Sequence, residues 1–129
     1  MASVYFHVPF CNQACHYCNF HFSTSLKNKT LLVKTMLSEL ELRKTELSKA
    51  ELISSIYFGG GTPSLLSAIE IKMMIDAVKT NFDLDSESEI TLEMNPEDDR
   101  PNYLKELKEV GINRLSIGVQ SFFDDELKL

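Results

Sequence analysis

The chain has 129 residues, of which 43% are hydrophobic and 25% charged, a composition typical of about one globular domain. Its formal net charge of -6 argues against a protein whose main partner is nucleic acid. No apolar run approaches the roughly 20 residues of a transmembrane helix, and no secretion signal begins the chain, so we expect a cytoplasmic protein.

The first half of the chain alternates between strand and helix patterns. Residues 3–9 and 52–58 are strand-like, and a helix is predicted at about 28–49. A second helix is predicted after Ser67, because Glu70 three residues later completes the pattern of a capping box. Apolar residues at helical spacing predict one buried face on each helix: Val33, Met36, Leu37, Leu40 and Leu47 in the first, and Ile71, Met74, Ile75, Val78 and Phe82 in the second.

The second half continues the alternation. We predict a polar turn at 83–88, a strand at 89–95, a helix at about 102–110 that ends at Gly111, and a strand at 114–120. Strands that alternate with helices predict parallel βαβ units, so we expect an α/β fold with about four parallel strands and three helices. The acidic residues that follow predict the first turn of another helix, which suggests a piece of a longer protein.

Each predicted strand has one apolar and one polar side, unlike the nearly continuous apolar strands usual in parallel sheets. We expect one side of the sheet to pack on helices, and the other either to line a cavity or to face water. The apolar sides are Val4, Phe6 and Val8; Ile90, Leu92 and Met94; and Leu115, Ile117 and Val119. The polar sides are Tyr5 and His7; Thr91, Glu93 and Asn95; and Ser116, Gly118 and Gln120.

Unusual residues mark the carboxyl ends of the predicted strands. The first strand leads into a cysteine-rich loop, the second into the glycine-rich run at 59–63, the third carries Glu93 and the fourth ends at Gln120. Ligands of parallel α/β sheets bind at these ends, so we expect one shared site there. The run at 59–63 matches neither a dinucleotide fingerprint nor a phosphate loop, because Ser64 replaces the last glycine and no Gly-Lys-Ser or Gly-Lys-Thr follows.

The cysteines follow the spacing CxxxCxxC and have two interpretations. Three thiolates can hold three irons of a 4Fe–4S cluster and leave the fourth iron open to a small-molecule ligand. A zinc site with three cysteines and one histidine is the alternative, and the spacing favours iron–sulfur without excluding zinc. The cysteines are Cys11, Cys15 and Cys18, and the histidines that could complete a zinc site are His7, His16 and His21.

Four motifs in order resemble those of one protein family. They are the run at 5–11, the cysteine motif, the run at 59–63, and the run at 116–122. Together they resemble the radical S-adenosylmethionine (SAM) enzymes, within the oxygen-independent coproporphyrinogen III oxidase-like group. The resemblance implies the N-terminal part of a radical SAM partial (β/α) barrel. Residues 1–129 would then be the N-terminal portion of the core domain, without the rest of the barrel or a C-terminal domain.

The resemblance also implies cofactors and site residues. Cys11, Cys15 and Cys18 would bind a 4Fe–4S cluster, and the amine and carboxylate of SAM would chelate the open iron. In this family, electron transfer then cleaves SAM to methionine and a 5′-deoxyadenosyl radical. Glu93 would bind polar SAM atoms such as the ribose hydroxyls, and no residue is assigned a catalytic role. The expected SAM contacts are Tyr5, Tyr17, Gly60, Gly61, Thr62, Glu93 and Gln120.

Two departures from the oxidases affect the predicted activity. The oxidases carry a fourth cysteine two residues after the third, where this chain has Phe20, and an extension ahead of the first strand. Both departures resemble the HemW-type heme chaperones, so we expect a heme-handling protein of tetrapyrrole metabolism. Its partners would be SAM, a tetrapyrrole and an unidentified electron donor, with heme bound by the full-length protein. The alternatives are an oxygen-independent coproporphyrinogen III dehydrogenase and, from another class, a structural zinc domain.

Overall fold

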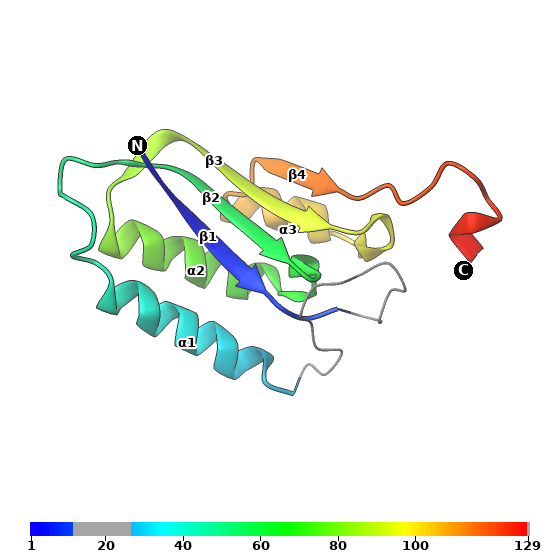
Figure 1. The fold of residues 1–129 in the computed structure, drawn as a ribbon, viewed down its shortest axis with the longest axis horizontal. Helices are drawn as coiled ribbons and strands as arrows, with labels where there is room; N and C mark the ends of the chain where they lie inside the picture. Colours follow the sequence, from blue (N-terminus) through cyan, green and yellow to red (C-terminus); the bar gives the residue numbers. More distant parts are fainter. Residues whose placement is uncertain (12–26, 129) are drawn as a thin grey trace.

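The computed structural model describes residues 1–11 and 27–128, and Figure 1 shows how their helices and strands are arranged. The strands are β1 (Ala2–Val8), β2 (Ile53–Gly60), β3 (Leu84–Met94) and β4 (Arg114–Ile117). The α-helices are α1 (Lys29–Leu42), α2 (Ala68–Asn81) and α3 (Tyr103–Val110). Short 3-10 turns follow at η1 (Pro63–Leu65), η2 (Pro96–Asp98) and η3 (Glu126–Lys128).

The strands form one parallel sheet in the order β1-β2-β3-β4. The register pairs Tyr5 with Tyr57, Tyr57 with Thr91, and Glu93 with Ser116. Because partners in register point to the same side of the sheet, these residues share its polar face. The α-helices cover the opposite face, with α2 in contact with both α1 and α3 (Figure 1). The predicted α/β fold of four parallel strands and three helices is confirmed.

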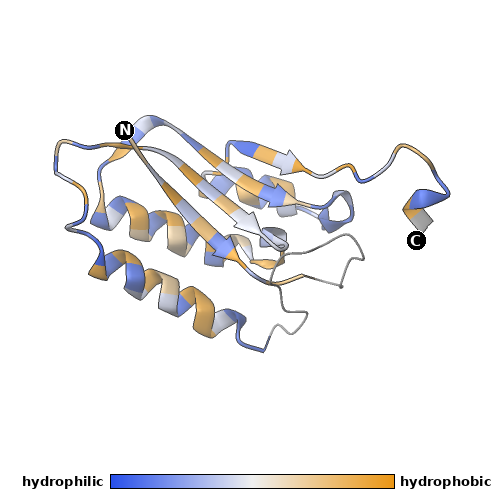
Figure 2. Ribbon diagram, viewed as in Figure 1, coloured by the Kyte–Doolittle hydropathy of each residue, from blue (hydrophilic) through white to orange (hydrophobic). Residues whose placement is uncertain are grey.

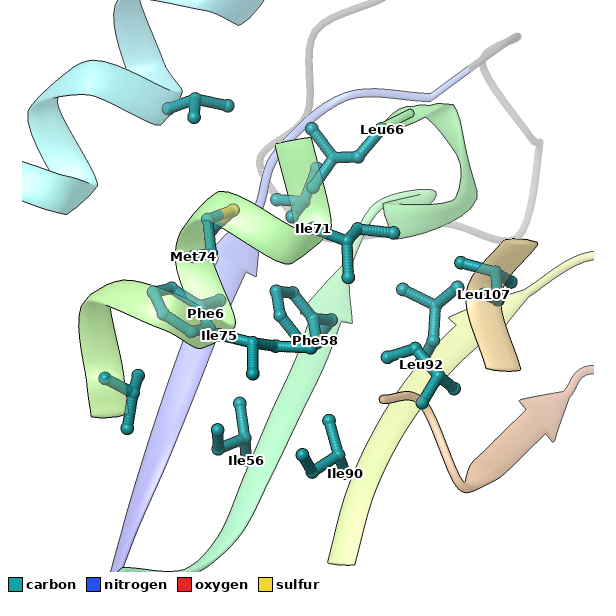
Figure 3. Close-up of a cluster of buried hydrophobic side chains, with 14 of the residues drawn as sticks. Phe6, Ile56, Phe58, Leu66, Ile71, Met74, Ile75, Ile90, Leu92 and Leu107 are labelled. Atoms are coloured by element: carbon teal, nitrogen blue, oxygen red, sulfur yellow. The ribbon is translucent and has the colours of Figure 1, made fainter. Parts of the chain in front are cut away.

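The hydrophobic core lies between the sheet and α2. Phe6 of β1 and Phe58 of β2 stack with their ring centroids 4.9 Å apart. Each apolar side chain that is fully buried contributes about 1.5–3 kcal/mol relative to exposure. The apolar residues of the strands alternate with polar ones along the chain, as Figure 2 shows by hydropathy. Figure 3 shows the core side chains that meet in this layer, among them Phe6, Ile56, Phe58, Ile71, Met74, Ile75, Ile90 and Leu92.

Helix α2 begins and packs as its sequence predicts. The Ser67 hydroxyl accepts a hydrogen bond from the Glu70 backbone amide at 3.2 Å, and the Glu70 carboxylate accepts one from the Ser67 amide at 2.8 Å. This reciprocal pair is the predicted capping box, which satisfies two backbone donors at the start of the helix. The predicted apolar stripe is buried at Ile71, Met74, Ile75 and Val78, and Phe82 packs partly against the core just beyond the helix.

The first helix is shorter than the predicted range of 28–49. Helix α1 ends at Leu42, and the chain continues through turns in which Leu47 still packs against the core. Leu40 is the last buried residue of α1. The helical positions three and four residues later are Arg43 and Lys44, whose charged side chains are 57% and 52% exposed, so packing on the core no longer supports the helix.

The predicted polar turn at 83–88 is wrong, because β3 already begins at Leu84. Leu84 pairs with Ile53 of β2, and the register then shifts between Ile53 and Ser55. From the pair of Ser55 with Glu89 onward, the two strands pair regularly. Ser86 and Glu87 are exposed within this part of the strand. Polar side chains can extend a strand when they point into solvent while the backbone pairs with its neighbour.

The last strand and the segment after it also differ from expectation. Strand β4 ends at Ile117, whereas the prediction ran to 120. Leu115, Ile117 and Val119 were expected to pack on a helix, yet they are 37%, 50% and 61% exposed. Strand β4 packs mainly on its neighbour β3, and the chain beyond it extends away from the sheet (Figure 1). The acidic end forms the short turn η3 instead of the first turn of an α-helix.

Candidate functional site

A small cleft of about 220 Å³ opens where β2, β3 and β4 end. Its walls are the loop after β2, the last residues of β3, and the segment that continues from β4. Four of the residues expected to contact SAM therefore lie together: Gly61, Thr62, Glu93 and Gln120. The other lining residues are Met94, Asn95, Ser116 and Gly118, which the sequence had not marked as SAM contacts.

The glycine run brings the end of β2 against the segment that follows β1. The Gly61 amide donates to the Val8 carbonyl oxygen at 2.7 Å, and the Thr62 amide donates to the Phe10 carbonyl oxygen at 2.6 Å. A Cβ atom at Gly61 would lie 2.4 Å from that Phe10 oxygen and 2.8 Å from Cys11 Sγ. Any side chain larger than hydrogen would therefore separate the two segments.

The first expected cluster ligand, Cys11, is half-buried beside Gly61. The other two, Cys15 and Cys18, lie outside the described residues, as do the expected SAM contact Tyr17 and the zinc-ligand candidates His16 and His21. The structure therefore brings one thiol to the edge of the sheet where the cleft opens.

Glu93 at the end of β3 is held by two donors from β2. The Tyr57 hydroxyl donates to Glu93 Oε1 at 2.6 Å, and the Gly60 amide donates to Glu93 Oε2 at 3.3 Å. The hydrogen bond with Glu93, together with burial, raises the pKa of Tyr57, so its hydroxyl keeps the proton that it donates. Sequence reasoning missed Tyr57, although its place on the polar side of β2 beside Tyr5 could have indicated it.

Tyr5 lies next to this pair on the polar face of the sheet. Its ring stacks on Tyr57 at a centroid distance of 6.0 Å, and its hydroxyl is 3.1 Å from His7 Nδ1. Burial and the negative charge of Glu93 raise the pKa of Tyr5. Tyr5 is 57% exposed and does not line the cleft itself. It is connected to the site by its ring contact with Tyr57 and by the charge of Glu93.

A buried polar network ties the loops after β2 and β3 together below the cleft. The Ser64 hydroxyl donates to Asp98 Oδ2 at 2.5 Å, and the same oxygen accepts from the Asn95 amide at 2.9 Å. The Asn95 side-chain amide is 3.5 Å from Thr62 Oγ1. Sequence reasoning missed this network, whose signal is a proline-led turn after each strand, at Pro63 and Pro96.

The cleft offers polar groups of several kinds within a small space. Glu93 supplies a carboxylate, Thr62 and Ser116 supply hydroxyls, and Asn95 and Gln120 supply side-chain amides. Such a lining suits a ligand with an amine, a carboxylate and sugar hydroxyls, while the nearby Cys11 thiol suits a soft metal. The described residues thus offer polar groups for such a ligand beside one thiol.

The model of the radical SAM superfamily matches residues 5–129 of this sequence. The chain belongs to the radical SAM superfamily. Membership implies a 4Fe–4S cluster and SAM as the cofactors of the fold.

Several characterised radical SAM proteins are similar along almost the whole chain. Heme chaperone HemW of Bacillus subtilis is 38% identical over 132 residues, covering 99% of this chain and 34% of its own length. HemW of Escherichia coli is 36% identical over 128 residues, covering 98% of this chain and 34% of its own. The mitochondrial radical S-adenosyl methionine domain-containing protein 1 of Danio rerio is 38% identical over 128 residues, covering 99% and 29%. The chain spans about a third of the length of these radical SAM relatives.

The fold is also that of a solved radical SAM enzyme. Coproporphyrinogen III oxidase of Escherichia coli superposes with a TM-score of 0.84 at 28% sequence identity, over 98% of this chain and 29% of that enzyme. The four parallel strands and three helices match the N-terminal part of its radical SAM barrel, which confirms the predicted family and fold. In the described residues no helix is both long and apolar enough to cross a membrane.

Proposed function

We propose that this chain is the N-terminal portion of the core domain of a HemW-like heme chaperone. The identity of 36–38% to HemW proteins over at least 98% of the chain supports the proposal. So does Phe20, which stands where the related oxidases carry a fourth cysteine. In this reading Cys11, Cys15 and Cys18 hold a 4Fe–4S cluster, and the protein works with a tetrapyrrole in the reducing cytoplasm.

The residues expected to contact SAM bind different parts of it. The Glu93 carboxylate accepts hydrogen bonds from the ribose hydroxyls, while Gly60, Gly61 and Thr62 approach the methionyl end beside the cluster. Gln120 offers a further amide, Tyr17 flanks the adenine, and Tyr5 supports SAM near the cluster. When bound, SAM supplies the one-electron chemistry of the family.

One observation carries the proposal: a polar cleft with a fixed carboxylate opens at the same edge of the sheet as Cys11. Parallel α/β folds bind their ligands at this edge. A structural zinc domain would use the Cys11 thiol as a ligand but would not require a polar cleft beside it.

Anaerobic reconstitution tests the cofactors. The protein that contains residues 1–129, at its full natural length, is reconstituted with iron and sulfide and analysed for both elements. Electron paramagnetic resonance of the reduced sample is then recorded with and without SAM. We expect about four irons and four sulfides per chain and a spectrum that changes when SAM binds. Zinc without sulfide would instead establish the structural domain, and the matched variant Cys11→Ala should lose the cluster.

A second assay separates a chaperone from an oxidase. The oxidase alternative is favoured by the TM-score of 0.84 to the coproporphyrinogen III oxidase of Escherichia coli. The reconstituted protein is titrated with heme and, separately, incubated anaerobically with coproporphyrinogen III, SAM and an electron donor. We expect stoichiometric heme binding without conversion of the porphyrinogen. Repeated turnover to protoporphyrinogen IX would contradict the chaperone proposal.

A further inference from the structure

We propose that Tyr57 is a positioning residue that holds the Glu93 carboxylate in place for SAM. The inference rests on the proposed function, because it concerns how the same cleft binds the same ligand. It assigns a role to a residue that the sequence motifs left without one.

The carboxylate of Glu93 is held at both oxygens by β2. Tyr57 donates to Oε1 at 2.6 Å and Gly60 donates to Oε2 at 3.3 Å. A carboxylate has about four acceptor positions, so two donors still leave acceptor capacity on each oxygen. Glu93 lines the cleft, and that remaining capacity is available to ligand hydroxyls or an amine there.

Gly59 makes the placement of the Tyr57 ring possible. A Cβ atom at Gly59 would lie 2.9 Å from Tyr57 Cε1 and 2.9 Å from Tyr5 Cε2. Both rings therefore need the space that this glycine leaves open, and they stack on each other with an interplanar angle of 27°. The first glycine of the run thus serves the two tyrosine rings, and its role is to let the Tyr57 hydroxyl reach Glu93.

Holding Glu93 before the ligand arrives favours binding. A free glutamate side chain samples several rotamers, and ordering it on binding opposes affinity. The two donors of β2 order it in advance, and a charged acceptor makes such hydrogen bonds stronger than those between neutral groups. Removal of the Tyr57 hydroxyl should therefore weaken SAM binding through Glu93, with the cluster left intact.

The test is a double-mutant cycle on SAM affinity. The dissociation constant of SAM is measured by equilibrium dialysis on the anaerobically reconstituted full-length protein and on Tyr57→Phe, Glu93→Gln and the double variant. We expect Tyr57→Phe to weaken binding by about 5- to 20-fold in the wild-type background and by less than about twofold in the Glu93→Gln background. Iron and sulfide contents should equal those of the wild type in all variants.

Tyr103→Phe is the matched control. It removes a tyrosine hydroxyl that bonds to the Leu66 carbonyl oxygen on the helix side of the sheet, away from the cleft. It should leave the dissociation constant of SAM within about twofold of the wild type. A second variant, Gly59→Ala, should weaken SAM binding as Tyr57→Phe does, because it displaces the ring that carries the hydroxyl.

The outcomes separate this inference from the proposed function. If the wild-type protein binds SAM but Tyr57→Phe binds it equally well, the positioning role is wrong and the proposed function stands. Equal losses in both backgrounds would also overturn it, because Tyr57 would then act independently of Glu93. A wild-type protein that takes up no cluster and no SAM would remove the proposed function itself.

Discussion

The sulfur atom of Cys11 lies against Gly61, so the start of the cysteine loop and the end of β2 are packed together without an intervening side chain. A Cβ atom at Gly61 would lie 2.8 Å from Cys11 Sγ and 2.4 Å from the Phe10 carbonyl oxygen. The second contact is with backbone that is itself bonded to Thr62 at 2.6 Å. The Phe10 backbone cannot move away without breaking this hydrogen bond between the two segments.

Gly61→Ala should therefore lower the free energy of unfolding by roughly 1–3 kcal/mol, because the added methyl group overpacks against backbone. Urea denaturation followed by circular dichroism measures the loss. Gly118→Ala is the control for stability, because its Cβ would meet only the flexible side chain of Gln120, with Nε2 at 2.9 Å. Equal stability of Gly61→Ala and the wild type would contradict the close packing.

The buried bond from Ser64 to Asp98 should also stabilise the fold. Ser64 is fully buried and donates to Asp98 Oδ2 at 2.5 Å. Its replacement, Ser64→Ala, should lower the free energy of unfolding by roughly 1.5–3 kcal/mol, because it takes a donor from a buried carboxylate. Ser38→Ala is the matched control on the exposed face of α1 and should change stability by less than about 0.5 kcal/mol. Similar losses in the two variants would argue against a specific role for the Ser64 bond.

Tyr103 should make stability depend on pH in alkaline solution. Burial raises the pKa of Tyr103 from its ordinary value of 10.0 to about 12. The raised value means that the stabilisation is complete below about pH 10 and is lost as pH rises toward about 12, where the folded state also ionises. The difference in unfolding free energy between the wild type and Tyr103→Phe should therefore shrink across this window. Urea titrations on both sides of pH 10 measure it, and a constant difference would refute the assignment.

Glu70 should make the stability of the fold depend on pH in acid, where its contribution is lost as pH falls. Burial by itself would raise the pKa of Glu70, but the Ser67 amide and the Lys29 ammonium outweigh it and lower the pKa below its ordinary value of 4.5. A lowered pKa stabilises the fold above about pH 4.5, and this contribution is lost as pH falls through the folded value.

Glu70→Gln should consequently unfold with a shallower pH dependence below pH 4.5 than the wild type. Lys29→Met should reduce the same dependence, because Lys29 Nζ lies 3.1 Å from Glu70 Oε2. Thermal unfolding midpoints between pH 3 and pH 6 test both variants. Identical slopes in the wild type and Glu70→Gln would contradict the shift.

Much of the fold was predictable because local patterns and packing agreed. The capping residues Ser67 and Glu70 and the stripe of α2 indicated a helix, and the structure has it at Ala68–Asn81. Prediction failed where long-range pairing decided the outcome. Leu84 joins β3 because Ile53 of a neighbouring strand pairs with it, and no local pattern marks that partner.

The candidate site was predictable to the extent that strand order brings residues together. Gly61, Thr62, Glu93 and Gln120 were expected at one edge of a parallel sheet, and they line one cleft. Tyr57 was missed because its role depends on the distance from its hydroxyl to a carboxylate on the next strand. Such a distance follows from register and twist, which are properties of the paired strands.

The sequence by itself determined the strand and helix order and the motifs of the family, because periodicity, capping and spacing are local along the chain. The tertiary structure alone decided which donors hold the Glu93 carboxylate. It also decided that no side chain fits at position 61, where Phe10 and Cys11 pack against Gly61. It also decided that the Ser64 and Asp98 loops are joined. These features arise from contacts between segments at least 33 residues apart, as in the Gly60–Glu93, Ser64–Asp98 and Tyr57–Glu93 bonds, and form only when the sheet is assembled.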